Sequence, residues 1–414
     1  MQPNTLFHCQ TTNTNKNMKL HLHLSVYFLS ALFFFSCTKS TDLSKAGSGE
    51  ALSDSYSGLR SGPGGGSSGN GGGTAGVITA GEWNDLDNWN FWKTLLTRDT
   101  IKDIPATWGL FTNNKVSIVL KDANNRLLHD ATITMLHNGE KVVAKTDNQG
   151  KAVLFAGLTK AGTSLTKFTL KAGYNGANFD LGTFNHDGNI IYKTIPVTKA
   201  VTKKLDILFV VDATGSMGDE ITYLKTELQD VINRSGTQLP GMQINMGSVF
   251  YRDNGDDYVT RPFDFTTSSS RLISFIKEQQ AGGGGDFPEA VDEALKVGTQ
   301  NMQWSTKAVN RLLFLVLDAP PHKLPAQVTR LKDAIKTAQE KGIRIIPISA
   351  SGIDLETEFL LRFLSISTNS TYIFITNDSG IGNPHHVPTV GTYTVEFLNN
   401  LMVRLITKYG KNMD

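Results

Sequence analysis

Leu205-Asp-Ile-Leu-Phe-Val-Val-Asp212-Ala-Thr214-Gly-Ser216-Met217 is an apolar run that ends in an aspartate and continues with two hydroxyl side chains. A continuous apolar run is typical of a parallel strand that is buried on both faces. Open α/β sheets place their sites at the carboxyl ends of such strands. One carboxylate and two hydroxyls suit a hard divalent cation, and they are too few to fill its coordination shell. The stretch therefore predicts a metal site that leaves positions open for water or for a partner's carboxylate.

Two later stretches have patterns of the same kind. One is a glycine-rich loop, Gly-Gly-Gly-Asp286-Phe-Pro288-Glu-Ala, which precedes a helical pattern from about residue 288 to residue 302. Proline at the start of a helix fits its preference for the first turn. The other is a second apolar run that ends in Leu-Asp318-Ala-Pro-Pro. The sequence therefore predicts a second buried strand that ends in an aspartate.

Together these motifs resemble the metal-ion-dependent adhesion site of von Willebrand factor A (VWA) domains, whose first motif is Asp-x-Ser-x-Ser. With Tyr251-Arg-Asp253 added, they resemble the VWA subgroup of hemicentin-like and bacterial surface proteins, over roughly residues 204–409. In that family Asp212, Thr214 and Ser216 would be ligands of the first loop.

The resemblance also implies ligands from the two later stretches. Asp318 would bind the ion directly or through water. The middle loop departs from the family pattern, because no threonine lies between residues 281 and 290. Asp286 is the nearest oxygen donor and is the expected substitute ligand. The implied ion is Mg²⁺, Mn²⁺ or Ca²⁺, and an acidic side chain of a protein partner would complete its shell.

Strand patterns alternate with helical patterns over this half of the chain. Such alternation predicts βαβ crossovers and an α/β fold with a doubly wound, mostly parallel sheet, here over residues 203–411. The segment 259–265 follows a turn signal and is expected to form an antiparallel edge. The expected strands are 205–211, 243–251, 259–265, 312–317, 343–349 and 371–376, and the expected helices are 219–234, 271–280, 288–302, 328–341, 355–364 and 395–409.

The first part of the chain predicts export. Residues 18–37 have a basic start and a short apolar core, which is the design of a secretory signal. The segment ends in Ser36-Cys37, which resembles a bacterial lipobox with Cys37 as the lipidated residue. The alternative is an ordinary signal peptide followed by an unrelated cysteine. The polar residues before Met18 fit no signal design, so Met18 is the expected start. Residues 1–37 are thus a predicted signal, and the expected location is a bacterial cell envelope with a lipid anchor.

Cysteine usage agrees with this interpretation. The chain contains only Cys9 and Cys37, so the folded parts would be cysteine-free. Disulfides and cysteine-based zinc sites are thereby excluded from them. Residues 38–78 are rich in glycine and serine and are expected to form a flexible linker.

Two further segments precede the metal-binding half. Residues 79–103 contain three of the five tryptophans, which could bind a ligand or pack against a neighbouring domain. Residues 104–200 show short strands at regular spacing, which predicts a smaller all-β sandwich. Their Thr-Asp147-Asn-Gln-Gly150 turn resembles carboxypeptidase-regulatory-like modules, which act as spacers or docking surfaces.

Several function classes are excluded or disfavoured. A net charge of +2 with no long basic run argues against nucleic-acid binding. Asp-x-Thr-Gly-Ser also resembles the motif of Mg²⁺-dependent aspartyl-phosphate enzymes, but residue 213 is alanine where phosphate-transferring pumps have lysine. His385-His386 and Asp206 are expected to have structural roles. The expected function is non-enzymatic, metal-dependent binding of a protein partner by an anchored lipoprotein. The alternative is a structural scaffold in which the metal only stabilises the loops.

Overall fold

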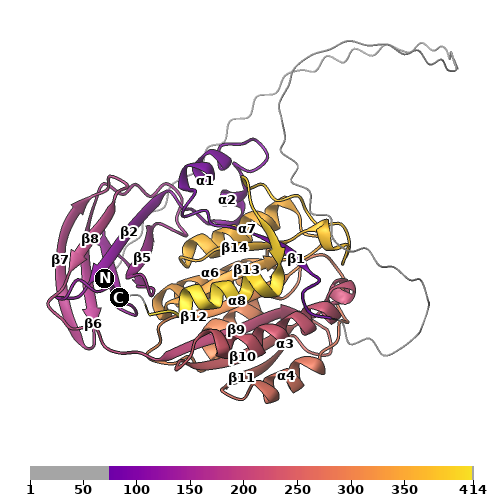
Figure 1. Cartoon of the computed structure of the whole chain (residues 1–414). Coiled ribbons are helices and arrows are strands. Elements are labelled where there is room, and N and C mark those ends of the chain that lie inside the picture. Colours follow the sequence, from indigo (N-terminus) through magenta and orange to yellow (C-terminus); the bar gives the residue numbers. More distant parts are fainter. Residues whose placement is uncertain (1–73, 413–414) are drawn as a thin grey trace, which may run out of the picture. The chain divides into compact units, whose positions relative to one another are not determined.

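An eight-stranded, mostly parallel sheet dominates the computed structural model, which describes residues 74–412 (Figure 1). Four neighbouring pairs are parallel and three are antiparallel. The α/β class and the doubly wound, mostly parallel sheet are thus confirmed. In sheet order the strands are β11 (Thr260–Thr266), β10 (Gln243–Tyr251), β9 (Lys204–Asp212), β12 (Arg311–Leu317), β13 (Ile343–Ser349), β14 (Tyr372–Ile375), β1 (Thr79–Trp83) and β15 (Val395–Phe397).

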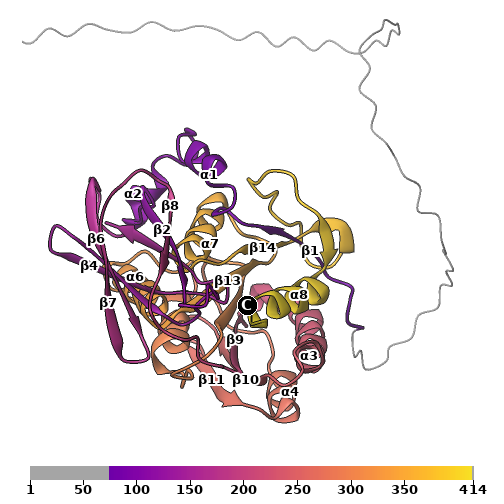
Figure 2. The same cartoon turned by 60° about the vertical axis from the view of Figure 1, so that its left-hand side comes forward.

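Helices cover both faces of this sheet (Figures 1 and 2). Alternate side chains of β9 enter two separate cores, since Leu208 and Val210 pack on one face and Ile207 and Phe209 on the other. One face is covered by α5 (Val291–Lys296), α6 (Pro325–Lys341) and α7 (Leu355–Ser367), and the other by α3 (Ile221–Gln238), α4 (Ser269–Lys277) and α8 (Leu398–Gly410).

Two predicted helices each start three residues later than expected. The helix predicted from residue 288 begins at Val291, because the Glu289 N–H bonds to the Pro320 carbonyl at 2.9 Å instead of entering a helical turn. Its last part, η2 (Val297–Asn301), is a π-helix. The helix predicted from Val395 begins at Leu398, because residues 395–397 form β15 and pair with β1.

β1 extends the sheet beyond the segment predicted from sequence. This strand lies before the β-sandwich in the chain, yet it pairs antiparallel with both β14 and β15. The buried Glu227 side chain of α3 accepts hydrogen bonds from the backbone N–H groups of Gly76, Val77 and Ile78. The α/β part is therefore built from two stretches of chain, one on each side of the sandwich.

The tryptophan-rich segment packs against both neighbouring parts of the molecule. It contains two short helices, α1 (Trp89–Leu95) and α2 (Ile104–Trp108). Trp92 is fully buried and stacks on Phe359 of α7 at 5.6 Å, and Trp89 lies 6.2 Å from Phe155 of the sandwich. These contacts favour the packing interpretation over ligand binding.

Seven strands form the sandwich around their own core. A three-stranded sheet runs β5 (Lys151–Ala156), β2 (Asn114–Lys121), β8 (Ile190–Thr194), and a four-stranded sheet runs β4 (Glu140–Lys145), β3 (Thr132–His137), β6 (Lys167–Tyr174), β7 (Ala177–Asn185).

Polar contacts join the sandwich to the α/β part. The turn at Asp147 and Asn148 contributes several of them, since Asn148 donates hydrogen bonds to the carbonyls of Lys408 and Lys411, both at 2.8 Å. Asp130 forms an ion pair with Arg311 at the start of β12. All described residues fall within one compact unit.

Two findings concern the expected membrane attachment. Within the described residues no helix is long and apolar enough to cross a membrane. The predicted signal with Cys37 and nearly all of the predicted linker lie outside the described residues.

Candidate metal centre

Asp212 is the last residue of β9, and the loop that follows fixes the orientation of its carboxylate. Its Oδ1 atom accepts hydrogen bonds from the Thr214 backbone N–H at 2.9 Å and from the Thr214 hydroxyl at 2.6 Å. The hydroxyls of Thr214 and Ser216 lie 3.1 Å apart. The chain then turns into a short 3₁₀ helix, η1 (Gly215–Asp219). Three of the predicted ligands are thus held together on one tight loop.

Asp318 follows β12 directly and reaches the same edge of the sheet. β12 is the parallel neighbour of β9, so the carboxyl ends of the two strands lie side by side. The chain connects β9 to β10 on one side and later places β12 on the other, which makes this gap a topological switch point. Ser216, Asp286 and Asp318 line one cavity of about 360 Å³ that opens to solvent.

The glycine-rich loop is joined to the first loop by backbone hydrogen bonds. Gly282 donates to the Ala213 carbonyl, and Gly215 donates to the Gly283 carbonyl, both at 3.0 Å. Gly284 has a φ angle of +74°, and a Cβ there would lie 2.9 Å from the Glu289 Oε1 atom and 3.4 Å from Thr214 Cβ. Glycine is therefore required for the close approach of the two loops.

That approach brings in Glu289, which the sequence analysis did not single out. Its side chain is buried and lies beside Thr214, and it lines the same cavity as Asp318. Its position is fixed because its backbone N–H bonds to the Pro320 carbonyl. The available signal was an acid placed directly before the apolar start of a helix, Ala290-Val291.

Three buried carboxylates of this site each have one oxygen without a hydrogen bond. These atoms are Oδ2 of Asp212, Oδ1 of Asp318 and Oε2 of Glu289. Burial raises the pKa of Asp212 to about 6, and burial with the nearby Asp212 raises the pKa of Asp318 to about 7. Burial and the surrounding aspartates raise the pKa of Glu289 to about 9. The negative charges thus lack compensation from the protein alone.

This donor set fits a hard divalent cation. All of its atoms are carboxylate or hydroxyl oxygens, which Mg²⁺, Mn²⁺ and Ca²⁺ prefer and soft metals do not. The Thr214 hydroxyl uses its proton to bond Asp212, so lone pairs on its oxygen stay available. A cation at this edge of the sheet, bound directly or through water, would compensate carboxylate oxygens that the protein leaves unpaired.

Asp286 occupies a different position from that of Glu289. Its side chain is exposed, and a ligand atom of Asp286 lies within 4.8 Å of those of Asp253 and His322. His322 and Asp253 form their own ion pair, with Nε2 and Oδ1 separated by 2.8 Å. Asp286 therefore lies at the rim of the cavity, whereas Glu289 is the buried carboxylate beside Thr214.

The other acids and histidines singled out from the sequence have structural partners. Asp206 accepts hydrogen bonds from Ser305 and Asn245, as expected for local pairing. His385 lies 2.9 Å from the buried Glu220, and His386 lies 3.1 Å from Glu358. The two histidines thus hold the loop after β14 against different helices.

Comparisons with known proteins identify the domain. The family profile of the von Willebrand factor type A domain matches residues 206–383. The chain thus contains a VWA domain in this region, and the sheet topology agrees with its fold. VWA domains generally act as non-enzymatic protein-interaction modules, and many bind a divalent metal at their adhesion site. The chain therefore has a domain suited to protein interaction or adhesion, and its described residues include an acidic and histidine-containing group, Asp253, Asp286 and His322.

Two curated relatives match parts of the chain. A putative ariadne-like RING finger protein of Acanthamoeba polyphaga mimivirus is 34% identical over 118 residues, which are 28% of this chain and 11% of the relative. The alpha-protein kinase vwkA of Dictyostelium discoideum is 24% identical over 190 residues, which are 46% of this chain and 29% of the kinase. The chain thus spans less than a third of either relative.

Two solved structures are also similar. BatB, a conserved hypothetical protein from Bacteroides thetaiotaomicron, has a TM-score of 0.34 at 13% identity, with 50% of this chain and 96% of BatB covered. Proximal thread matrix protein 1 from the mussel byssus has a TM-score of 0.36 at 16% identity, with 50% of this chain and 46% of that protein covered. The domain assignment rests on the family profile and the sheet topology.

Proposed function

We propose that this chain binds a protein partner through a divalent cation held at the carboxyl ends of β9 and β12. The observation that carries the proposal is the set of three buried carboxylate oxygens without partners, on Asp212, Asp318 and Glu289. Thr214 and Ser216 add hydroxyl oxygens from the first loop. Mg²⁺ is the ion we favour, with Mn²⁺ and Ca²⁺ as alternatives of the same chemistry.

The cation would act as a bridge to the partner. It neutralises the carboxylates and offers an open position to an acidic side chain of the partner. Phe287 lines the same cavity and is 44% exposed, which gives the partner an apolar contact beside the ion. Large exposed aromatic side chains are frequent at binding hot spots. We therefore infer a protein ligand with a carboxylate next to an apolar group.

Glu289 and Asp286 are the two candidates for the fourth acidic ligand. Burial beside Thr214 favours Glu289, and exposure at the rim favours contact of Asp286 with the partner or with an outer water. The metal-binding experiment below separates the two, because only a ligand's removal weakens binding of the ion in the absence of a partner.

A phosphohydrolase function is disfavoured by the lining of the cavity. Besides a metal ion, enzymatic phosphoryl transfer uses lysine or arginine side chains that stabilise the phosphate oxygens. Among the described residues that line this cavity there is no lysine or arginine. We therefore propose a binding protein and not an enzyme.

A scaffold function remains the alternative to metal-bridged adhesion. In that case the ion stabilises the loops, and partner binding is independent of it. Partner capture that persists in EDTA would support the scaffold. We also propose that Cys37 anchors the chain to a bacterial cell envelope, on the strength of the signal-like sequence before it. Mass spectrometry of the mature protein, with Cys37→Ala as control, tests the lipid.

The first experiment is a thermal melt of the full-length protein in EDTA and in Mg²⁺ or Mn²⁺. A ligand that binds only the folded state stabilises it by about 2.7 kcal/mol at a concentration of 100 Kd. We expect the melting temperature to rise with metal in the wild type and not in Asp212→Asn. Asp257→Ala removes an exposed acid from a neighbouring loop and should respond like the wild type.

The remaining variants assign the ligands. Glu289→Gln should weaken the metal response strongly, whereas Asp286→Asn should leave it nearly unchanged. The reverse order would make Asp286 the ligand. A wild-type protein whose melting temperature does not change with any of the three ions would refute the metal site.

A further inference from the structure

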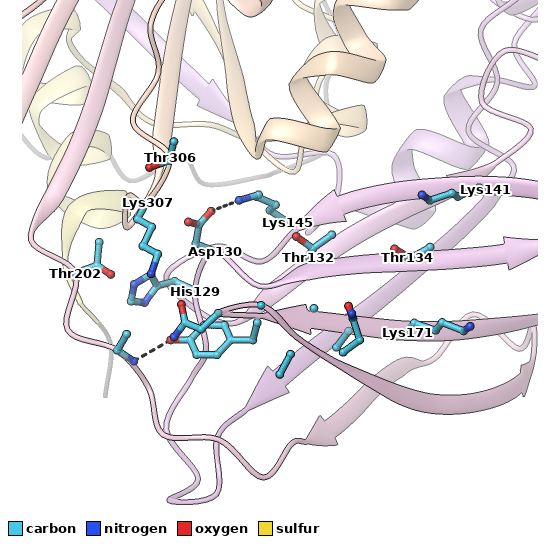
Figure 3. A pocket seen from close by; sticks show the side chains of 18 of the residues that line it. His129, Asp130, Thr132, Thr134, Lys141, Lys145, Lys171, Thr202, Thr306 and Lys307 are labelled. Carbon is cyan, nitrogen blue, oxygen red and sulfur yellow. Dashed lines mark hydrogen bonds and ion pairs between the residues drawn. The ribbon is translucent and has the colours of Figure 1, made fainter.

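The β-sandwich carries an open groove with a volume of about 880 Å³ (Figure 3). It lies on the outer face of the four-stranded sheet, because Thr132 and Thr134 of β3 line it while Ile133 and Met135 of the same strand enter the core. The loop before β12 closes one side of the groove with Thr306. This volume is within the range of small-ligand sites, and nothing in the proposed metal function uses it.

Three lysines from separate elements surround the groove. Lys141 belongs to β4, Lys171 to β6, and Lys307 to the loop before β12. All three are exposed, and none of their side-chain ammonium groups forms a hydrogen bond or an ion pair with another residue between 74 and 412. Figure 3 shows Lys307 at one end and the other two at the opposite end. Positive charge is therefore present at both ends of the groove (Figure 3).

The acids near the groove do not neutralise these lysines. Asp130 is the one acid among the described residues that line it, and its carboxylate pairs with Lys145 and Arg311, both at 2.8 Å. Asp180 is the register partner of Lys171 on β7, but a single carboxylate offsets the charge of only one of the lysines. The groove thus keeps a net positive charge.

The floor of the groove offers hydrogen-bonding groups. His129 is only 2% exposed, and its Nδ1 atom has no partner within the described chain. Burial, with the nearby Lys199, lowers the pKa of His129 to about 4, so its ring is neutral at physiological pH. A neutral imidazole can both donate and accept a hydrogen bond. The hydroxyls of Thr132, Thr134 and Thr202 add further donors and acceptors.

We propose that this groove binds an oligosaccharide that carries acidic groups. The lysines supply separate point charges for carboxylates or sulfates along a chain, in contrast to the forked recognition of one anion by arginine. The threonine hydroxyls and His129 match the hydroxyl groups of sugars. The groove offers little apolar surface to a peptide, because Leu136 is the one large apolar side chain that is exposed among the described lining residues.

Calorimetric titration of the full-length protein in EDTA tests this proposal without the metal site. The probes are a galacturonate hexamer for carboxylates, a heparin-derived hexasaccharide for sulfates, and maltohexaose as the neutral control. We expect at least one acidic probe to bind, with an affinity that falls as NaCl screens the lysines. Lys171→Ala and Lys307→Ala should each weaken binding by about fivefold. Lys160→Ala removes an exposed sandwich lysine outside the groove and should have no effect.

Each outcome decides for or against the groove. The preferred acidic probe identifies carboxylate or sulfate as the recognised group. Binding of neither probe, equal binding of maltohexaose, or binding that both lysine variants retain would overturn the proposal. A glutamate hexapeptide that binds more tightly than both sugars would replace the sugar by a peptide. Displacement by equimolar inorganic sulfate would show that only an ion binds. The variants should keep the metal-dependent rise in melting temperature if that site exists.

Discussion

A buried ion pair between Asp85 and Arg362 holds the tryptophan-rich segment to the VWA domain. Removal of this ion pair should lower the free energy of unfolding substantially. Both side chains are fully buried. The guanidinium group of Arg362 donates to both carboxylate oxygens of Asp85, at 2.6 and 2.9 Å, and the Trp83 indole donates to Oδ1 at 3.0 Å. The Trp92 ring lies 5.1 Å from the same guanidinium group.

The change Asp85→Ala leaves this guanidinium group without its main partner. Glu358 stays within 3.3 Å, and the Thr389 carbonyl within 2.8 Å, so compensation is incomplete. Breaking a buried ion pair by removing one partner costs about 3–5 kcal/mol. The Trp83 indole also loses its acceptor, which adds about 1 kcal/mol or more. We therefore expect Asp85→Ala to lower the free energy of unfolding by roughly 4–6 kcal/mol. Asp85→Asn keeps an acceptor and should lose less.

Urea denaturation followed by tryptophan fluorescence measures this loss, because Trp83 and Trp92 lie at the ion pair. Asp87→Ala is the matched control, since Asp87 is an exposed acid two residues away in the same segment. Its unfolding midpoint should stay close to that of the wild type. If Asp85→Ala and Asp87→Ala unfold at the same urea concentration, the ion pair does not hold the segment and the reasoning is refuted. If Asp85→Ala cannot be purified folded, Asp85→Asn provides the comparison.

Two further predictions concern the carboxylates and the contact between sandwich and VWA domain. In EDTA the folded-state pKa values of Asp212, Asp318 and Glu289, about 6, 7 and 9, exceed their ordinary values of 3.8, 3.8 and 4.5. The folded state therefore binds more protons than the unfolded state. In EDTA the melting temperature should be highest at low pH and should fall as the pH rises through these values. In saturating Mg²⁺ this fall should disappear. Asn148→Ala removes three hydrogen bonds of a buried side chain. It should lower the free energy of unfolding in urea by about 2–3 kcal/mol. Gln149→Ala changes an exposed neighbour and should leave this free energy almost unchanged. A pH profile unaffected by Mg²⁺, or equal losses for the two sandwich variants, would contradict these predictions.

Much of the sheet could be predicted because its central strands are buried on both faces. Such strands are continuous apolar runs, and the predicted bounds of 243–251 and 343–349 coincide with β10 and β13. The antiparallel edge at β11 was predicted from a local turn signal and is confirmed. β1 could not be predicted in the same way. It has only five residues, and its partners in β14 lie almost three hundred positions later in the chain.

The candidate site was predictable only in part, for a related reason. Asp212 and Asp318 each follow an apolar strand pattern, and the resemblance to VWA domains assigned them to one site at the carboxyl edge of a parallel sheet. Glu289 depends on a loop whose path is fixed by contacts with Gly284 and the Pro320 carbonyl. Such contacts have no periodic signal in sequence. Asp286 was selected as the first oxygen donor in the glycine-rich loop, and sequence distance did not reveal that it lies at the rim.

The two proposed binding sites lie toward opposite ends of β12 and carry opposite charges. The lysine groove includes Lys307, which precedes the strand, and the metal site includes Asp318, which follows it. A strand of seven residues spans about 23 Å at roughly 3.3 Å per residue. That distance is more than twice the screening length of about 8 Å at physiological ionic strength. Direct electrostatic coupling between the two sites is therefore weak. A protein partner at the metal and an acidic saccharide in the groove can bind at the same time, and the failure of either proposal leaves the other unaffected.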